Sequence, residues 1–249
     1  MKFCASCFIA AIAFEASAAA QREVHASVLY VAAPRPGENT HAAAGNGSAG
    51  APFQTIADAL QAAPPGALIR IAEGTYPEAV LIARPVVLLG AGRDKTKIVG
   101  PTGARATAVR TGGGVRVELR DLTVEQAAAA ISAEGGSMRL ENVALRALDD
   151  AALVARDSQI VFSNSEVTDV GGGVTGVALE IDGGSLEMRR SVIRAGGRRA
   201  IKLRRGHAVL EAVDVSRSGL AALQVLDGAE VAIEDGRFEW FGGAALYAG

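Results

Sequence analysis

The chain has 249 residues, of which 49% are hydrophobic and 21% are charged, and its formal net charge is −2. This is the composition of a folded, apolar-rich protein, and the near-neutral charge argues against a dedicated nucleic-acid-binding protein. One domain accounts for this length. We therefore expect no nucleic acid among its partners.

The first segment, residues 1–20, has the pattern of a secretory signal peptide: a positive residue, an apolar run at 8–14 and small residues at 16–20. A short N-terminal helix is the alternative. Both cysteines, Cys4 and Cys7, lie inside this segment. We therefore expect a secreted or periplasmic mature chain without disulfides or cysteine-bound metal. No later segment is long and apolar enough to span a membrane.

Residues 21–66 are expected to hold a first strand at 28–31, a Pro/Gly-rich loop and a short amphipathic helix at 53–63. One face of this helix carries the apolar residues Phe53, Ile56, Leu60 and Ala63. The segment Pro64-Pro65-Gly66 ends the helix. A solenoid must cover its open apolar end, and this helix is well placed to do so.

Residues 67–249 are dominated by short apolar runs that repeat with a period of about 22. The runs at 68–71, 73–76, 80–82 and 86–89 start the series. The repeat is clearest in one column of apolar residues, with intervals of 22, 26, 22, 22 and 23: Ile131, Leu153, Leu179, Ile201, Leu223 and Leu246. The long interval coincides with the Gly-rich insert at 171–176, which we interpret as a loop that leaves the register intact.

A fixed period of this length, built from runs too short for helices, is typical of a solenoid. Three runs per turn predict a right-handed, single-stranded parallel β-helix of the all-β class. A left-handed hexapeptide coil would need ~18 residues per turn and a propeller blade ~40. Short polar residues that tolerate the left-handed backbone conformation mark one corner: Asp121, Asn142, Asn164 and Asp235.

The motif PFQTIADAL at 52–60, with IRI at 69–71 and GTY at 74–76, resembles the N-terminal signature of the pectin-lyase-like right-handed β-helix superfamily. The segment GAG at 90–92, followed by KTKI at 95–98, is similar to pectinesterases of that group. The resemblance implies the fold and a relation to polysaccharides, often polyuronates. The Arg-Pro-Trp, Trp-x-Asp-His and Asp-Pro-His-Asp signatures of its enzymes are absent from the sequence.

The catalytic candidates are Asp149 and Asp150, which resemble the paired aspartates before a strand in polygalacturonases. Inverting hydrolysis needs one carboxylic acid and one carboxylate base with room for water between them. The resemblance also calls for an aspartate one turn back, where residues 127–130 are all alanine, and for a Gly-His-Gly segment that is missing. A polar loop corner is the alternative, and the sequence does not decide whether the protein is an enzyme.

The ligand-binding candidates form a basic cluster in an otherwise near-neutral chain: Arg189, Arg194, Arg198, Arg199, Lys202 and Arg204. Such a face would attract an acidic polysaccharide, because arginine binds carboxylates in a bidentate manner. The alternative is surface pairing with neighbouring turns. Lys202 would then meet Glu180, and Arg189 would meet Glu211.

We expect no cofactor and no metal site, since Glu180 and Asp182 alone cannot supply the six to eight oxygens that Ca²⁺ requires. Aromatic residues gather only in the last repeat, at Phe238, Trp240 and Phe241. The last repeat reaches the end of the given sequence without a polar cap. A fragment, a longer protein and end-to-end self-association remain open. The functional hypotheses are a secreted polysaccharide-binding protein, a structural or adhesive solenoid, and a lyase or hydrolase with a degenerate or missing site.

Overall fold

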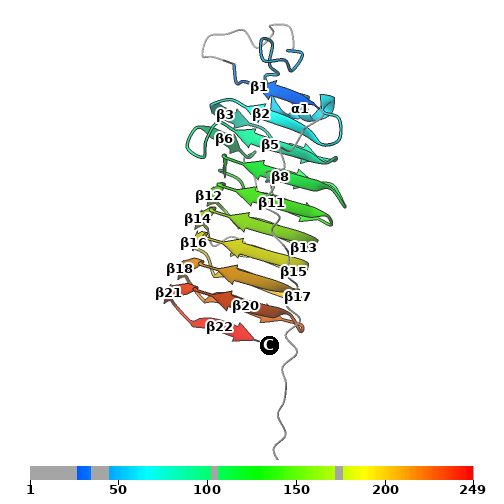
Figure 1. Ribbon diagram of the computed structural model, residues 1–249. Coiled ribbons are helices and arrows are strands. Elements are labelled where there is room, and N and C mark those ends of the chain that lie inside the picture. Colours follow the sequence, from blue (N-terminus) through cyan, green and yellow to red (C-terminus); the bar gives the residue numbers. More distant parts are fainter. Residues whose placement is uncertain (1–26, 35–44, 102–105, 172–175, 249) are drawn as a thin grey trace, which may run out of the picture.

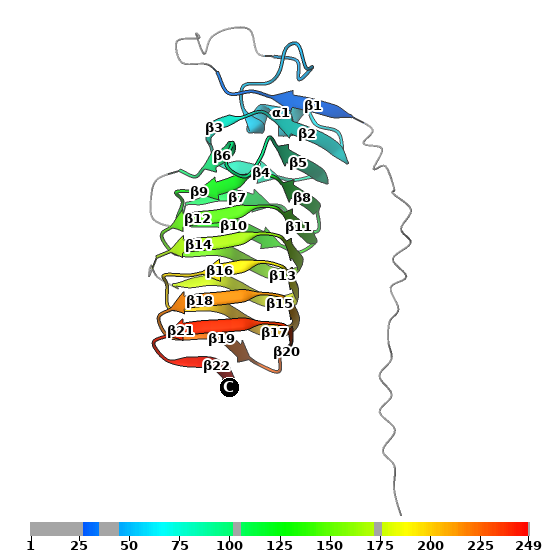
Figure 2. The ribbon, with the colours of Figure 1, turned by 60° about the vertical axis from the view of Figure 1, so that its left-hand side comes forward.

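The computed structural model describes residues 27–34, 45–101, 106–171 and 176–248. They form a parallel β-solenoid of about 8 turns with about 22 residues per turn, visible in Figures 1 and 2 as a stack of coils along one axis. The predicted right-handed parallel β-helix is confirmed. The predicted signal peptide lies outside the described residues, so secretion stays a prediction. In the described segments, no helix has the length and apolar character needed to cross a membrane.

One face of the coil is an eight-stranded sheet in which each strand pairs in parallel with the strand one turn away. Its strands run from the N-terminal to the C-terminal end in this order: β3 (Gly74–Pro77), β6 (Thr96–Val99), β9 (Thr123–Glu125), β12 (Ala144–Leu148), β14 (Glu166–Val170), β16 (Val192–Arg194), β18 (Asp214–Ser218) and β21 (Arg237–Phe241).

The remaining strands form a 14-stranded sheet that bends into two ladders. The first ladder contains β4 (Val80–Ile82), β7 (Thr107–Thr111), β10 (Ala129–Glu134), β19 (Ala221–Leu226) and β22 (Ala244–Ala248). The second contains β1 (Val28–Val31), β2 (Ala67–Ile71), β5 (Val86–Gly90), β8 (Arg116–Arg120), β11 (Ser137–Glu141) and β20 (Glu230–Glu234).

Three 13-residue strands cross from the first ladder to the second: β13 (Ala151–Ser163), β15 (Val177–Arg189) and β17 (Arg199–Glu211). Each bends at a position of positive φ, which is Asp157 at 45° in β13, Gly183 and Gly184 at 78° each in β15, and Arg205 at 50° in β17. The bend divides each long strand into two of the three runs that the repeat predicts per turn.

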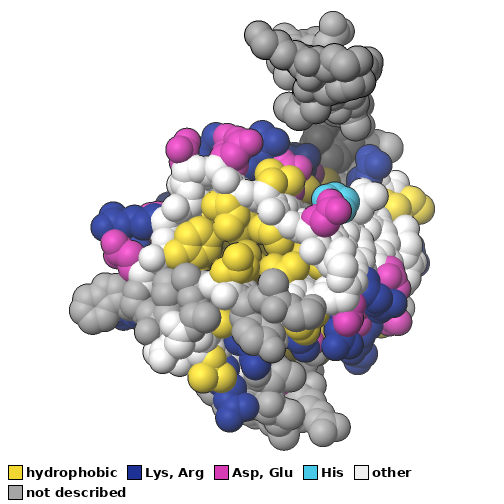
Figure 3. All heavy atoms as spheres, turned by 90° about the horizontal axis from the view of Figure 1, so that it is seen from below, with side chains coloured by type: hydrophobic (Ala, Val, Ile, Leu, Met, Phe, Trp, Pro, Cys, Tyr) yellow, Lys and Arg dark blue, Asp and Glu magenta, His cyan; other side chains and the backbone are white. Residues whose placement is uncertain are grey.

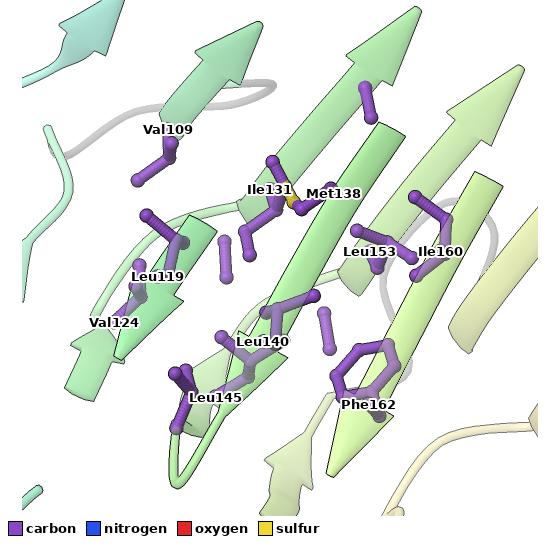
Figure 4. Close-up of a cluster of buried hydrophobic side chains, with 14 of the residues drawn as sticks. Val109, Leu119, Val124, Ile131, Met138, Leu140, Leu145, Leu153, Ile160 and Phe162 are labelled. Carbon is purple, nitrogen blue, oxygen red and sulfur yellow. The ribbon is translucent and has the colours of Figure 1, made fainter. Parts of the chain in front are cut away.

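The core consists of apolar side chains that stack from turn to turn inside the coil, as Figure 4 shows for its middle turns. The predicted column pairs in the predicted register, for example Ile131 with Leu153 and Leu153 with Leu179. A second column stacks Leu140 on Phe162, and both side chains are fully buried. Each such side chain contributes about 1.5–3 kcal/mol of burial free energy. The pairing of Leu153 with Leu179 confirms that the insert does not disturb the register.

The predicted corner between the second ladder and the eight-stranded sheet has the left-handed backbone conformation. The φ angles there are 54° for Asp121, 53° for Asn142, 51° for Asn164 and 52° for Asp235. The Asn142 side-chain amide donates a hydrogen bond to the Asp121 carboxylate one turn away. Short polar side chains therefore tolerate the bend and also link neighbouring turns.

The helix α1 (Ile56–Ala62) lies at the N-terminal end of the coil, next to β1 and β2 (Figure 1). It is shorter than the predicted 53–63. Thr55 has extended φ and caps the helix by accepting a hydrogen bond from Asp58 N at 3.0 Å. Phe53 N instead donates to Tyr30 O at 2.8 Å, which keeps Phe53 extended beside β1. Ile56 and Leu60 are buried, as the predicted apolar face requires.

At the opposite end, hydrophobic side chains occupy the centre of the face and charged side chains surround them (Figure 3). Ile233 is 44% exposed and Leu246 is 58% exposed. Phe238 packs against the core, whereas the side chains of Trp240 and Phe241 lie outside the described ones. End-to-end self-association stays a prediction.

Candidate functional site

One corner of the coil carries the predicted acidic residues together with part of the predicted basic cluster. It lies where each strand of the eight-stranded sheet leads into the first ladder. Backbone hydrogen bonds join its successive turns, with Asp150 N to Ala128 O at 2.9 Å, Arg198 N to Gly176 O at 2.8 Å and Leu220 N to Arg198 O at 2.7 Å. Asp150 and Arg198 are therefore two turns apart, ~10 Å along the axis at ~4.8 Å per turn. We call this the insert corner, because the turn between them carries the 171–176 insert.

Glycines occupy the position of Asp149 in the turns that follow it. Gly171 comes one turn after Asp149, and Gly197 and Gly219 occupy the next two turns. A Cβ added at Gly197 would lie 2.9 Å from Gly171 O and 3.0 Å from Gly176 O, so no side chain fits there. Glycine at these positions leaves no side chain beside Arg198, although the backbone of Gly197 is itself buried.

Asp150 has a structural contact at this corner. Its Oδ1 atom accepts a hydrogen bond from Gly176 N at 3.1 Å, which links the turn before the insert to the residue that ends the insert. Asp149 is exposed. The two carboxylates occupy consecutive positions on one turn, one of them engaged with the backbone, so we derive no hydrolytic step from them. Catalysis by Asp149 and Asp150 remains a hypothesis from the sequence.

Arg198 and Arg199 present the cationic side of the insert corner. The stem of Arg198 lies across Gly176, since a Cβ built on Gly176 would be 3.1 Å from Arg198 Cγ. Arg198 is exposed, and Arg199 is half-buried at the start of β17. Within the described segments, neither guanidinium forms an ion pair or a side-chain hydrogen bond.

The other four predicted cations are each paired with a carboxylate. The pairs are Arg189 with Glu187 at 2.6 Å, Arg194 with Glu166 at 3.2 Å, Lys202 with Glu180 at 2.7 Å, and Arg204 with Asp227 at 2.9 Å. Surface pairs of this kind contribute about 0–1 kcal/mol each, but they compensate the charge of the cluster. The expected contact of Arg189 with Glu211 is also present, at 3.5 Å.

The six predicted ligand-binding residues do not share one face. Arg189 ends β15 on the second ladder, and Arg194 belongs to β16 in the eight-stranded sheet. The other four lie together, at the insert corner or on the adjoining half of β17: Arg198, Arg199, Lys202 and Arg204. A nearby arginine outside the predicted set, Arg205, donates to Asp182 at 2.7 Å, and this hydrogen bond raises the pKa of Arg205.

Sequence reasoning did not bring Asp150 and Arg198 to the same corner. The signal was present in the spacing. The intervals of 26 and 22 that take Leu153 to Leu179 and Ile201 also take Asp150 to Gly176 and Arg198. Within the segments described, no three His, Asp or Glu residues gather as a possible metal site.

The comparisons with known proteins bear on the fold. A family model described as a protein of unknown function, DUF1565, matches residues 37–153, which is under half of the chain. A comparison with curated proteins found no match. Similar solved structures include pectin methylesterase PemA from Erwinia chrysanthemi, with 13% identity, coverage of 88% of this chain and 89% of that chain, and a TM-score of 0.40.

Two further solved structures have similar sequence identities and TM-scores. A pectin methylesterase from carrot is 14% identical over 88% of this chain and 82% of that chain, with a TM-score of 0.43. An alginate lyase from Paenibacillus sp. strain FPU-7 is 13% identical over 78% of this chain and 95% of that chain, with a TM-score of 0.47. At such identities and scores these structures do not identify a reaction for this chain.

Proposed function

We propose that this protein binds an acidic polysaccharide at the insert corner. The observation that carries the proposal is the pair of consecutive arginines, Arg198 and Arg199, beside the glycines of the corner. Within the described residues these cations have no carboxylate partner, unlike the other four of the predicted cluster. A guanidinium presents a planar fork of N–H donors that matches a carboxylate, and a uronate chain supplies one carboxylate per sugar.

Lys202 and Arg204 extend this binding surface along β17. Glu180 and Asp227 hold them at 2.7 Å and 2.9 Å. A polyanion would have to compete with these carboxylates, so we assign the first contacts to Arg198 and Arg199. Lys202 and Arg204 add attraction at low ionic strength, where exposed charges more than about 10 Å apart still interact.

A structural or adhesive solenoid is the second candidate. The observation in its favour is that paired charges cover much of the coil, including Arg189 with Glu187 and Arg194 with Glu166. In that case the charges maintain solubility and link neighbouring turns. A protein of this kind would show no salt-dependent binding to acidic glycans.

Co-sedimentation distinguishes the two candidates. The purified chain is incubated with polygalacturonate, alginate and a neutral glucan at low and at high salt, while reducing ends and unsaturated products are followed. The proposal predicts binding to the two acidic glycans alone, weakened by salt and without cleavage. Absence of binding leaves the structural candidate, and cleavage returns Asp149 and Asp150 to consideration.

A further inference from the structure

A hollow of about 270 Å³ lies between α1 and β4, several turns from the insert corner. Its lining includes Leu60 and Ala57 of the helix and Leu81 of the strand. Val80 and Ile82 on either side of Leu81 are buried in the core, so the alternation of the strand directs Leu81 outward. Apart from Gln61 and Arg84, the residues that line the hollow are apolar.

Leu81 is unusual for its place in the fold. It is 64% exposed, although it lies on the side of the coil. The exposed residues Val28, Ile233 and Leu246 belong to the first or last strands of the stack, whereas Leu220 lies at the insert corner and is less exposed than Leu81. Around Leu81 the small side chains of Ala57, Ala79 and Ala83 leave the hollow unfilled.

One cation lines this apolar surface, and a second lies one turn away beside Leu81. Nη1 of Arg84 donates a hydrogen bond to Ala63 O at 2.9 Å, which holds its guanidinium at the edge of the hollow near the end of α1. Arg110 does not line the hollow, but it is exposed and is the register partner of Leu81 on β7, one turn away. Neither arginine has a carboxylate partner among the residues described, and no residue that lines the hollow is acidic.

We propose that this hollow binds a small amphipathic organic anion, with its apolar body on Leu60 and Leu81 and its carboxylate at Arg84 and Arg110. Burial of apolar ligand surface on the leucines and alanines supplies the affinity, and the two guanidinium groups select the charge. The volume is slightly below the ~300–1,000 Å³ of drug-sized sites, which favours a ligand of one or two rings. This site is independent of the polysaccharide proposed for the insert corner.

The test uses 2-naphthoate as the probe, because its fluorescence anisotropy reports binding to the whole chain. The uncharged analogue 2-naphthylmethanol measures the contribution of the carboxylate. We expect saturable binding of naphthoate at least tenfold tighter than that of the alcohol. Leu81→Ser and Arg110→Gln should each weaken naphthoate binding at least fivefold. These exposed residues can change without loss of the fold, whereas Arg84→Gln also removes a helix contact and serves as a supporting variant.

Leu220→Ser is the matched control, because Leu220 is 47% exposed and belongs to the insert corner. It should leave naphthoate binding unchanged. The proposal is overturned if naphthoate does not saturate, if the alcohol binds equally well, or if Leu220→Ser weakens binding as much as Leu81→Ser.

Discussion

The carboxylate of Glu78 lies at the N-terminus of α1, where it accepts hydrogen bonds from Ile56 N at 2.8 Å and from Ala57 N at 2.9 Å. Glu78 follows β3, so one turn of the coil supplies the cap of the helix that precedes it. The negative charge also interacts favourably with the positive end of the helix. This contact fixes α1 to the coil.

Replacement of Glu78 should therefore loosen α1. We expect Glu78→Ala to lower the free energy of unfolding by about 1–2 kcal/mol, the range for a lost charged cap. Urea denaturation measures the change. Glu73→Ala is the control, since Glu73 is exposed and has no partner among the described residues. Equal effects of the two substitutions would refute the role of Glu78.

Two buried serines, Ser218 and Ser165, should change the stability in opposite directions when each is replaced by alanine. Ser218 is 2% exposed, and its hydroxyl has no hydrogen-bond partner among the described residues. Ser165 is also buried, but its hydroxyl donates to Ser163 O at 2.9 Å and accepts from Val143 N at 3.1 Å. We expect Ser218→Ala to raise the unfolding free energy by about 1 kcal/mol and Ser165→Ala to lower it by about 1–2 kcal/mol. A destabilised Ser218→Ala variant would contradict this account.

Tyr76 should make stability depend on pH in alkaline solution. Its hydroxyl donates to Ala72 O at 3.0 Å, and burial raises the pKa of Tyr76 above its ordinary value of 10.0. Tyr76 then ionises at a lower pH in the unfolded chain than in the folded chain. Its contribution to the stability of the fold is therefore complete below pH 10.0 and falls as the pH rises above it. The stability difference between wild type and Tyr76→Phe should shrink above pH 10. A constant difference would refute the assignment.

Removal of Glu180 should strengthen polyanion binding. Its carboxylate holds Lys202 Nζ at 2.7 Å, so Glu180→Gln frees a cation next to the insert corner. We expect the affinity for polygalacturonate at low salt to rise about threefold, with a stability loss of about 1 kcal/mol or less. Glu166→Gln is the control, because it makes the same charge change beside Arg194 on the eight-stranded sheet. An equal rise in both variants would mean that only net charge matters.

The sequence was sufficient to predict the coil because each turn depends on local rules. Apolar residues such as Leu153 and Leu179 recur at the spacing of one turn, and Asn142 and Asn164 mark a bend with positive φ. Both signals survive the insert. The beginning of α1 was predicted less well, because the backbone pairing of Phe53 beside β1 is a contact between distant segments.

The candidate site was only partly predictable. Opposite charges at neighbouring turns identified the pairing of Lys202 with Glu180. Sequence proximity, however, suggested one basic face, whereas a turn of the coil distributes Arg189, Arg194 and Arg198 over three sides. The hollow beside Leu81 was missed, because its walls come from α1 and β4 and its volume depends on how these pack.

The binding of polygalacturonate by two double variants tests the proposed function most directly. One variant, Arg198→Ala/Arg199→Ala, removes the cations of the insert corner. The other, Arg189→Ala/Arg194→Ala, makes the same charge change at paired arginines. We predict that the first weakens binding at low salt at least tenfold, whereas the second changes it less than threefold. Equal losses in both variants, or none in the first, would contradict a binding site at the insert corner.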